Sequence, residues 1–194
     1  MEPANVNNVN TRRARRPREV HYQGKFIRAV SEDGWEWVER TNAAGAVVIV
    51  PITAQGEVVL IEQYRIPLHA RVIELPAGLA GDAAGDEDES LLAAARRELL
   101  EETGFEADRW EYLTEGPSSA GLATEVFALY LARDARRVAP GGGDSAEEIA
   151  VHVVPHAELE PWLERRRAEG AMIDPKVFAG LYFALTRGAL NQSH

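Results

Sequence analysis

The sequence of 194 residues contains no cysteine, which excludes disulfide bonds and metal sites built from thiolates. It also has no apolar run approaching the roughly 18 residues that a membrane-spanning helix needs. The first residues lack the apolar core of a secretion signal. We therefore expect a soluble cytoplasmic protein that neither enters a membrane nor is exported.

Acidic residues outnumber basic ones, because 31 Asp and Glu face 21 Lys and Arg, which gives a formal net charge of -10 at pH 7. A nucleic-acid backbone needs a basic surface that displaces its counterions, so we expect no nucleic-acid partner. Small anionic substrates remain compatible with this charge if a divalent cation bridges them to acidic groups. Five arginines do gather in "TRRARRPR" at residues 11–18, but residues 1–18 hold few apolar side chains and are predicted to be a disordered basic tail.

The segment after the tail, residues 19–42, is predicted to form a small antiparallel β unit. Residues 20–30 and 35–40 resemble two strands joined by an Asp33-Gly34 turn. Segments rich in β-branched residues predict further strands. These segments are 44–52, 57–65, 71–78, 110–116, 124–134 and 148–155.

The pattern becomes helical between Asp86 and Thr103, where apolar residues recur at three- and four-residue spacings. Asp86 and Glu89 are spaced as a capping box, and Gly104 stands where a helix C-cap is expected.

Two more helices are predicted near the end of the sequence, over 156–170 and 174–190. The second would begin with Asp174 as its N-cap and Pro175 at its first position. Strands before, between and after helices indicate an α/β (α+β) fold, with a mixed sheet covered on both faces. We expect one main domain over residues 43–194.

The predicted acidic helix carries Glu98, Glu101 and Glu102 on one face. Carboxylates at this spacing repel one another, and a hard divalent cation such as Mg²⁺ relieves that repulsion by binding their oxygens. A solvated face, partly neutralised by Arg96 and Arg97, is the alternative for an isolated pattern of this kind.

The residues around these acids resemble the second half of the Nudix box. Seven residues separate Glu89 from the pattern Arg-Glu-apolar-x-Glu-Glu-x-Gly-apolar, which runs from Arg97 to Phe105. The first half departs from that pattern, because Ala83 stands six residues before Glu89. We interpret "LAGDAAGDED" as a lengthened loop, so that Gly78 after "ELPA" is the equivalent glycine.

The resemblance extends from about Ala43 onward and is closest to the branch that hydrolyses ADP-ribose and related nucleoside diphosphate sugars. "LIEQYRIP", "ELPAGL" and "EEIAVHVV" carry it outside the box. It implies an α/β/α sandwich and Mg²⁺-dependent hydrolysis, with Mn²⁺ as a substitute, to a nucleoside monophosphate and a sugar phosphate. Ala120 stands where the branch often has proline, so ADP-ribose is only narrowly preferred over GDP-mannose or UDP-sugars.

The resemblance also assigns roles to single residues. Metal ligands would be the backbone carbonyl of Ala77 and the side chains of Glu98 and Glu102, with Glu101 assisting. Glu89 and Arg97 would form a structural ion pair, and Gly78 and Gly104 would complete the motif. Arg65 in "EQYR" would contact the phosphate or ribose of the substrate.

The general base is less well defined by the resemblance. Related enzymes carry a glutamate on a mobile loop, but Ser145 occupies that place here. Its neighbours Asp144, Glu147 and Glu148 lie on a glycine-rich loop, and Glu147 is the first choice. Glu125 in "SSAGLATE" is the other candidate. Because Ser145 replaces the expected base, one alternative function is a sensor that binds a nucleotide sugar without cleaving it. A second alternative is a Nudix pyrophosphatase that acts on another nucleoside diphosphate derivative.

Three aromatic residues in the N-terminal unit have two interpretations. Phe26, Trp35 and Trp37 can stack on a nucleotide base, or they can bury a sheet or dimer face. In the resembling branch the N-terminal strands build a dimer whose sites share residues. We therefore expect a homodimer that binds a small nucleotide-sugar substrate.

Overall fold

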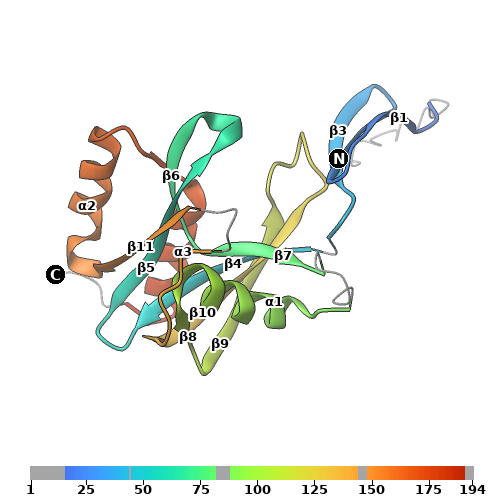
Figure 1. The fold of residues 1–194 in the computed structure, drawn as a ribbon. Helices are drawn as coiled ribbons and strands as arrows, with labels where there is room; N and C mark the ends of the chain where they lie inside the picture. Colours follow the sequence, from blue (N-terminus) through green and yellow to red (C-terminus); the bar gives the residue numbers. More distant parts are fainter. Residues whose placement is uncertain (1–15, 44, 82–87, 144–147, 191–194) are drawn as a thin grey trace, which may run out of the picture.

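The computed structural model describes residues 16–43, 45–81, 88–143 and 148–190. Within these ranges the chain forms a three-stranded sheet, a nine-stranded sheet and three α-helices (Figure 1). The predicted α/β class, with a mixed sheet and a separate small antiparallel unit, is confirmed.

The small sheet is antiparallel and contains β1 (Glu19–Gln23), β2 (Ile27–Glu32) and β3 (Trp35–Arg40). The prediction of a single strand over 20–30 was wrong. The chain reverses direction at Gly24, whose N–H donates to the Ile27 carbonyl at 2.8 Å. The predicted turn between β2 and β3 is present, with φ angles of 53° at Asp33 and 87° at Gly34.

The large sheet is built around β4 and β10, which lie parallel to each other. Most of the other pairs are antiparallel, so the sheet is mixed. Its strands are β4 (Gly45–Thr53), β5 (Glu57–Arg65), β6 (Ala70–Glu74), β7 (Ala77–Ala80), β8 (Phe105–Glu106), β9 (Arg109–Pro117), β10 (Val126–Arg137), β11 (Ile149–Pro155) and β12 (Met172–Ile173).

The predicted strand over 71–78 is in fact two strands with different partners. β6 pairs with β5, whereas β7 pairs with β4. The break falls at Leu75 and Pro76, because proline has no N–H to donate to a neighbouring strand. This break moves Ala77 and Gly78 onto β4 and beside the acidic helix.

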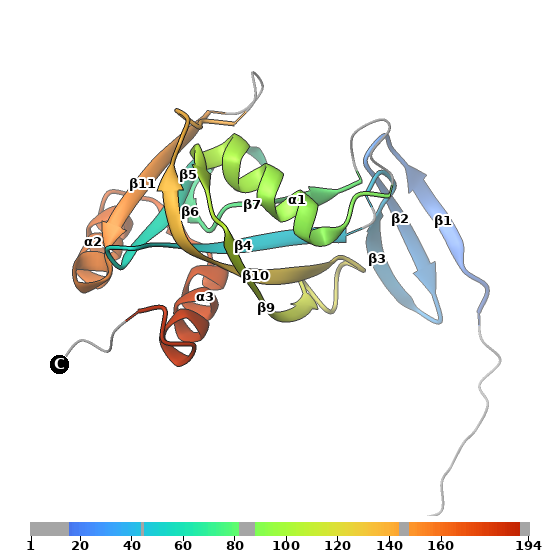
Figure 2. The same ribbon diagram turned by 90° about the horizontal axis from the view of Figure 1, so that it is seen from below.

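Helices cover both faces of the large sheet, as predicted. Figure 2 shows α1 (Leu91–Glu98) on one face and α3 (Pro175–Thr186) on the other, with α2 (His156–Ala168) at one end. Leu99 and Phe105 belong to the buried cluster under α1, and Leu129 and Leu131 to the cluster under α2 and α3. None of the helices in the described ranges is long and apolar enough to cross a membrane.

The acidic helix begins later than predicted. α1 starts at Leu91, and Ser90 is its N-cap, because the Ser90 side chain accepts the Ala93 N–H at 3.2 Å. Asp86 of the predicted capping box lies outside the described residues, and Glu89 lies ahead of the helix rather than in its first turn. The last turn, Leu99–Thr103, is π-helical.

Both predicted helix-end signals are confirmed. Gly104 ends the π-helical turn with a φ of 73°, and its N–H donates to the Leu100 carbonyl at 2.8 Å. Asp174 caps α3 by accepting the Lys176 N–H at 2.7 Å, and Pro175 occupies the first turn.

The small sheet contacts the main body through β3. The N–H of Val38 donates to the Leu122 carbonyl at 2.8 Å, and the Thr124 N–H donates to the Val38 carbonyl at 3.2 Å. The loop that precedes β10 therefore joins the two sheets.

Candidate active site

A pocket of about 330 Å³ lies where β7, α1 and the first halves of β4 and β10 meet. We call it the central pocket. Its charged lining residues come from six different segments of the chain. The acids are Glu74, Glu98, Glu102 and Glu125, and the cations are Arg40, Arg65 and Lys176.

Glu98 and Glu102 both face the central pocket, from the last residue of α1 and from the π-helical turn. Such turns are frequent at functional sites. Glu102 is only 4% exposed and accepts the Ala77 N–H at 2.9 Å. Glu98 lies so close over Gly78 that a Cβ at that position would come within 1.9 Å of the Glu98 Cδ. A glycine on β7 therefore provides the space that the Glu98 carboxylate occupies.

Arg97 connects the helix to the chain that precedes it. Its Nη2 lies 3.0 Å from Glu89 Oε2 and donates to the Leu79 carbonyl at 2.9 Å. Its Nη1 lies 2.8 Å from Glu98 Oε1 and 3.1 Å from Glu101 Oε2. The hydrogen bond from Arg97 lowers the pKa of Glu89, and the same bond raises the pKa of Arg97. The predicted ion pair is thus present, and it ties β7 and Glu89 to α1.

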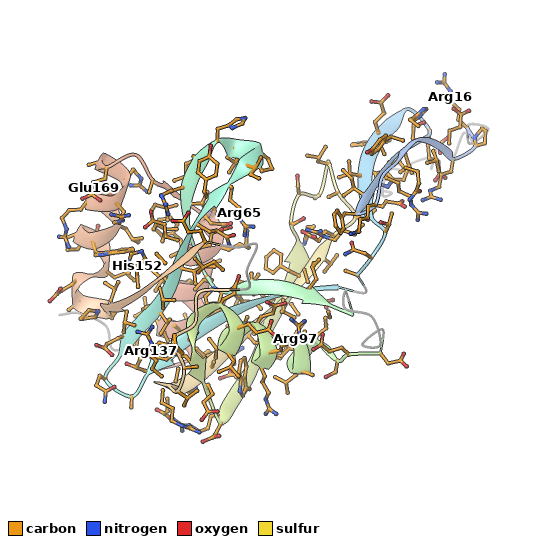
Figure 3. All side chains as sticks on the ribbon, viewed as in Figure 1. Arg16, Arg65, Arg97, Arg137, His152 and Glu169 are labelled. Carbon is orange, nitrogen blue, oxygen red and sulfur yellow. The ribbon has the colours of Figure 1, made fainter. Side chains whose placement is uncertain are left out.

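Glu101 differs from the other two glutamates of the motif. Its side chain is 54% exposed and turns toward Arg97, and it is not among the residues that line the central pocket. In Figure 3, Arg97 lies on the α1 side of β7, while Arg65 lies on the side of β5 and β6.

Arg65 and Glu125, both predicted from sequence, do reach the central pocket, and each has a partner that sequence reasoning missed. Two nitrogens of Arg65 donate to Glu74, at 2.8 and 3.1 Å. Glu125 forms an ion pair with Arg40 from the small sheet. Lys176 also reaches the pocket, where it pairs with Asp174. Nothing in the local sequence marks Arg40, Glu74 or Lys176, because only the fold brings them together.

Of the remaining candidates for a general base, Glu148 is described by the structure and does not line the central pocket. The Glu148 side chain is 88% exposed and lies 3.5 Å from Arg71 Nη2. Glu147 lies outside the described residues. The glycine segment ahead of it contacts the acidic turn, because the N–H groups of Gly142 and Gly143 donate to the carbonyls of Glu102 and Glu101 at 2.8 and 3.1 Å.

Two of the three predicted aromatic residues share a second pocket of about 410 Å³. Trp35 and Trp37 line it together with Glu32, Asp33 and the loop 120–124. Phe26 is not in its lining. The Phe26 ring is 53% exposed and contacts Lys25, whose Nζ lies 4.7 Å from the ring centre.

The donor atoms of the central pocket suit a hard cation. Within residues 16–43, 45–81, 88–143 and 148–190, no three acidic or imidazole side chains form a complete metal centre. Glu98 and Glu102 nevertheless bring carboxylate oxygens to one pocket, whose lining also includes Ala77. Mg²⁺ is commonly held by one or two carboxylates, with water and substrate phosphates completing its shell. This incomplete set of oxygens therefore fits Mg²⁺.

Comparison with known proteins agrees with this arrangement. Residues 42–176 match the NUDIX domain. The chain belongs to the NUDIX domain family. It is 36% identical over 105 residues to a methanol dehydrogenase activator of Bacillus methanolicus, covering 54% of both chains. It is 35% identical over 138 residues to an ADP-ribose pyrophosphatase of Mycobacterium tuberculosis, covering 71% of this Nudix chain and 63% of that protein.

Another relative is matched over more of its length. A GDP-mannose pyrophosphatase of Cronobacter sakazakii is 34% identical over 155 residues, which is 76% of each chain. The Nudix chain thus spans about half to three quarters of these relatives. The crystal structure of an ADP compounds hydrolase shares the fold, with a TM-score of 0.60 and 24% identity over 76% of this chain and 80% of that one.

Proposed function

We propose that this Nudix protein hydrolyses the diphosphate bond of ADP-ribose or a related nucleoside diphosphate sugar, with Mg²⁺ as cofactor and Mn²⁺ as a substitute. The central pocket is the observation that carries this proposal, because it combines a carboxylate pair with several cations. Water attacks one phosphorus, the bridging P–O bond breaks, and the products are a nucleoside monophosphate and a sugar phosphate.

Glu98, Glu102 and the Ala77 carbonyl would hold the cation in this proposal. When bound, a divalent ion neutralises diphosphate charge and lowers the pKa of a coordinated water. Arg65 is well suited to orient the diphosphate, since its planar guanidinium presents several donors to phosphate oxygens. Arg40 and Lys176 add positive charge to the same pocket.

The proton of the attacking water needs an acceptor within hydrogen-bond reach. Glu147 remains our proposal, and Glu125 is the alternative, because it lines the central pocket. Glu148 and Glu101 are weaker candidates, since their side chains are exposed and turn toward Arg71 and Arg97. Replacing the true base with glutamine should lower kcat by about 10²- to 10⁴-fold, so Glu147→Gln and Glu125→Gln separate the two candidates.

We also propose that residues 19–42 mediate a homodimer and that residues 43–194 form the hydrolase domain. Exposed apolar side chains on β1 and on the turn that follows it, including Val20, Tyr22 and Phe26, support this role. Light scattering after size exclusion would test it, and a monomer at micromolar concentration would contradict it. Trp35 and Trp37 would stack on the base of the substrate.

A substrate panel tests the proposed reaction. Purified protein with Mg²⁺ should release a monophosphate from ADP-ribose, GDP-mannose or UDP-glucose, and Glu102→Gln should remove most of this activity. Glu160→Gln is the matched control, because Glu160 is an exposed residue of α2 outside the central pocket. Failure to cleave any member would contradict the proposal. Thermal stabilisation by a ligand that is not cleaved would favour the sensor instead.

A further inference from the structure

The pocket around Trp35 and Trp37, which we call the tryptophan pocket, also contains an acidic group. In the β2–β3 register, Glu32 lies opposite Trp35 and Val30 lies opposite Trp37. Residues directly opposite each other in antiparallel strands point to the same face of a sheet. The Glu32 carboxylate and both indole rings therefore share the face that lines this pocket.

The other wall of the tryptophan pocket offers few hydrogen-bond donors. The loop N–H groups of Leu122 and Ala123 already donate to the Ser119 carbonyl, at 3.0 and 2.9 Å. The Trp37 indole N–H is also used, because it donates to Glu39 Oε1 at 2.9 Å.

The acceptors of this pocket are less fully used. Asp33 Oδ1 accepts the Arg16 N–H at 2.6 Å. Within the part of the chain that the structure describes, Glu32 has no hydrogen bond or ion pair through its carboxylate. Among the described residues, the tryptophan pocket thus presents two aromatic faces and a carboxylate without a hydrogen-bond donor. Its volume of about 410 Å³ lies in the ordinary range for small-molecule sites.

A carboxylate beside aromatic rings selects among the nucleotide bases. Guanine presents two adjacent donors, N1–H and the N2 amino group, which match the two oxygens of a carboxylate. Adenine places its N6 amino group beside the N1 acceptor, which a carboxylate repels. Uracil and cytosine likewise place an acceptor next to each Watson–Crick donor. We propose that the tryptophan pocket binds guanine, with Glu32 accepting both donors, so that the substrate is a guanosine diphosphate sugar.

This assignment rests on the proposed function for the position of the diphosphate. Ser118 and Glu125 line the central pocket, and the residues between them, 120–124, line the tryptophan pocket. One short loop therefore borders both pockets. The proposed ligand spans this loop, with its diphosphate in the central pocket and its base against Trp35 and Trp37.

Three nucleotide sugars that differ only in the base test the inference. We expect kcat/KM for GDP-glucose to exceed that for ADP-glucose and UDP-glucose by about tenfold or more, as a bidentate contact to one base gives. Glu32→Gln should remove this preference by lowering the GDP-glucose value, while the ADP-glucose value changes less than about twofold. Glu36→Gln is the control, because Glu36 lies between the two tryptophans on the opposite face of β3.

The outcomes separate this inference from the proposed function. Equal values for the three sugars, or a preference for ADP-glucose that Glu32→Gln leaves intact, would overturn the guanine assignment while the hydrolase remains. If none is cleaved, binding is measured directly from the rise in Tm with GDP, ADP and UDP. A larger rise with GDP that is lost in Glu32→Gln supports the assignment, and equal rises with the three nucleotides refute it.

Discussion

Replacing Gly78 with alanine should displace the Glu98 carboxylate without unfolding the protein. The new Cβ would come within 1.9 Å of the Glu98 Cδ, whereas carbon atoms in contact lie about 3.5–4.0 Å apart. The carboxylate must therefore move by roughly 1.6–2.1 Å. Metal–ligand distances tolerate only about 0.2 Å, and a displacement of 1 Å in an active site can cost about 10²-fold in rate.

We expect Gly78→Ala to lower kcat at saturating Mg²⁺ by at least about 10²-fold. Its Tm should change little, because the end of the Glu98 side chain can rotate away from β7. Gly116→Ala is the matched control, since a Cβ on Gly116 of β9 meets nothing within 4 Å. Steady-state kinetics and thermal unfolding of both variants provide the comparison. Wild-type turnover in Gly78→Ala would refute the placement of Glu98 in the reaction.

Two stability predictions follow from the ends of the acidic helix. The hydrogen bond from Arg97 lowers the pKa of Glu89 in the folded protein. The ionised pair therefore stabilises the fold at pH values above the unfolded pKa of about 4.3. This stabilisation is lost as the pH falls through the lower pKa that Glu89 has in the folded protein. Glu89→Gln should therefore lower the free energy of unfolding by about 1.5–3 kcal/mol at pH 7. Measured by urea denaturation, the difference in this free energy between variant and wild type should shrink at lower pH. A difference that does not depend on pH would contradict this prediction. Gly104→Ala should cost more than Gly56→Ala in the same assay. Both glycines have positive φ, but of the two only Gly104 would place a new Cβ in a clash, 2.0 Å from the Ala139 carbonyl oxygen. Equal losses of unfolding free energy in the two variants would show that the protein relieves this clash.

Local signals predicted most of the elements. The spacing of leucines and alanines predicted α1, and Asp174, Pro175 and Gly104 marked helix ends where the structure has them. The two wrong strand predictions, over 20–30 and 71–78, fall where a strand-like composition continues although the chain begins to pair with a different strand. The chain reverses at Gly24 and changes neighbours after Pro76, and hydrophobic composition alone marks neither event.

The candidate site was only partly predictable for a different reason. Glu98 and Glu102 belong to the half of the motif with fixed spacing, and Gly78 was identified only by allowing for a lengthened loop, so sequence alone indicated their neighbourhood. Arg40 and Lys176 are far apart in the chain and meet through sheet pairing and the packing of α3. Glu32 carries no local signal either, because a single glutamate before a turn is common in sequences, and only the strand register places it beside Trp35.

We propose that Glu98 and Glu102 together hold a divalent cation in the central pocket. Electron paramagnetic resonance of free Mn²⁺ measures this binding directly, without turnover. We expect Glu102→Gln and Glu98→Gln each to weaken Mn²⁺ binding by at least about tenfold, which corresponds to roughly 1.4 kcal/mol. Glu160→Gln should bind Mn²⁺ as wild type does. If both pocket variants retain wild-type affinity while remaining folded, the cation site lies elsewhere and the proposed role of the two glutamates is wrong.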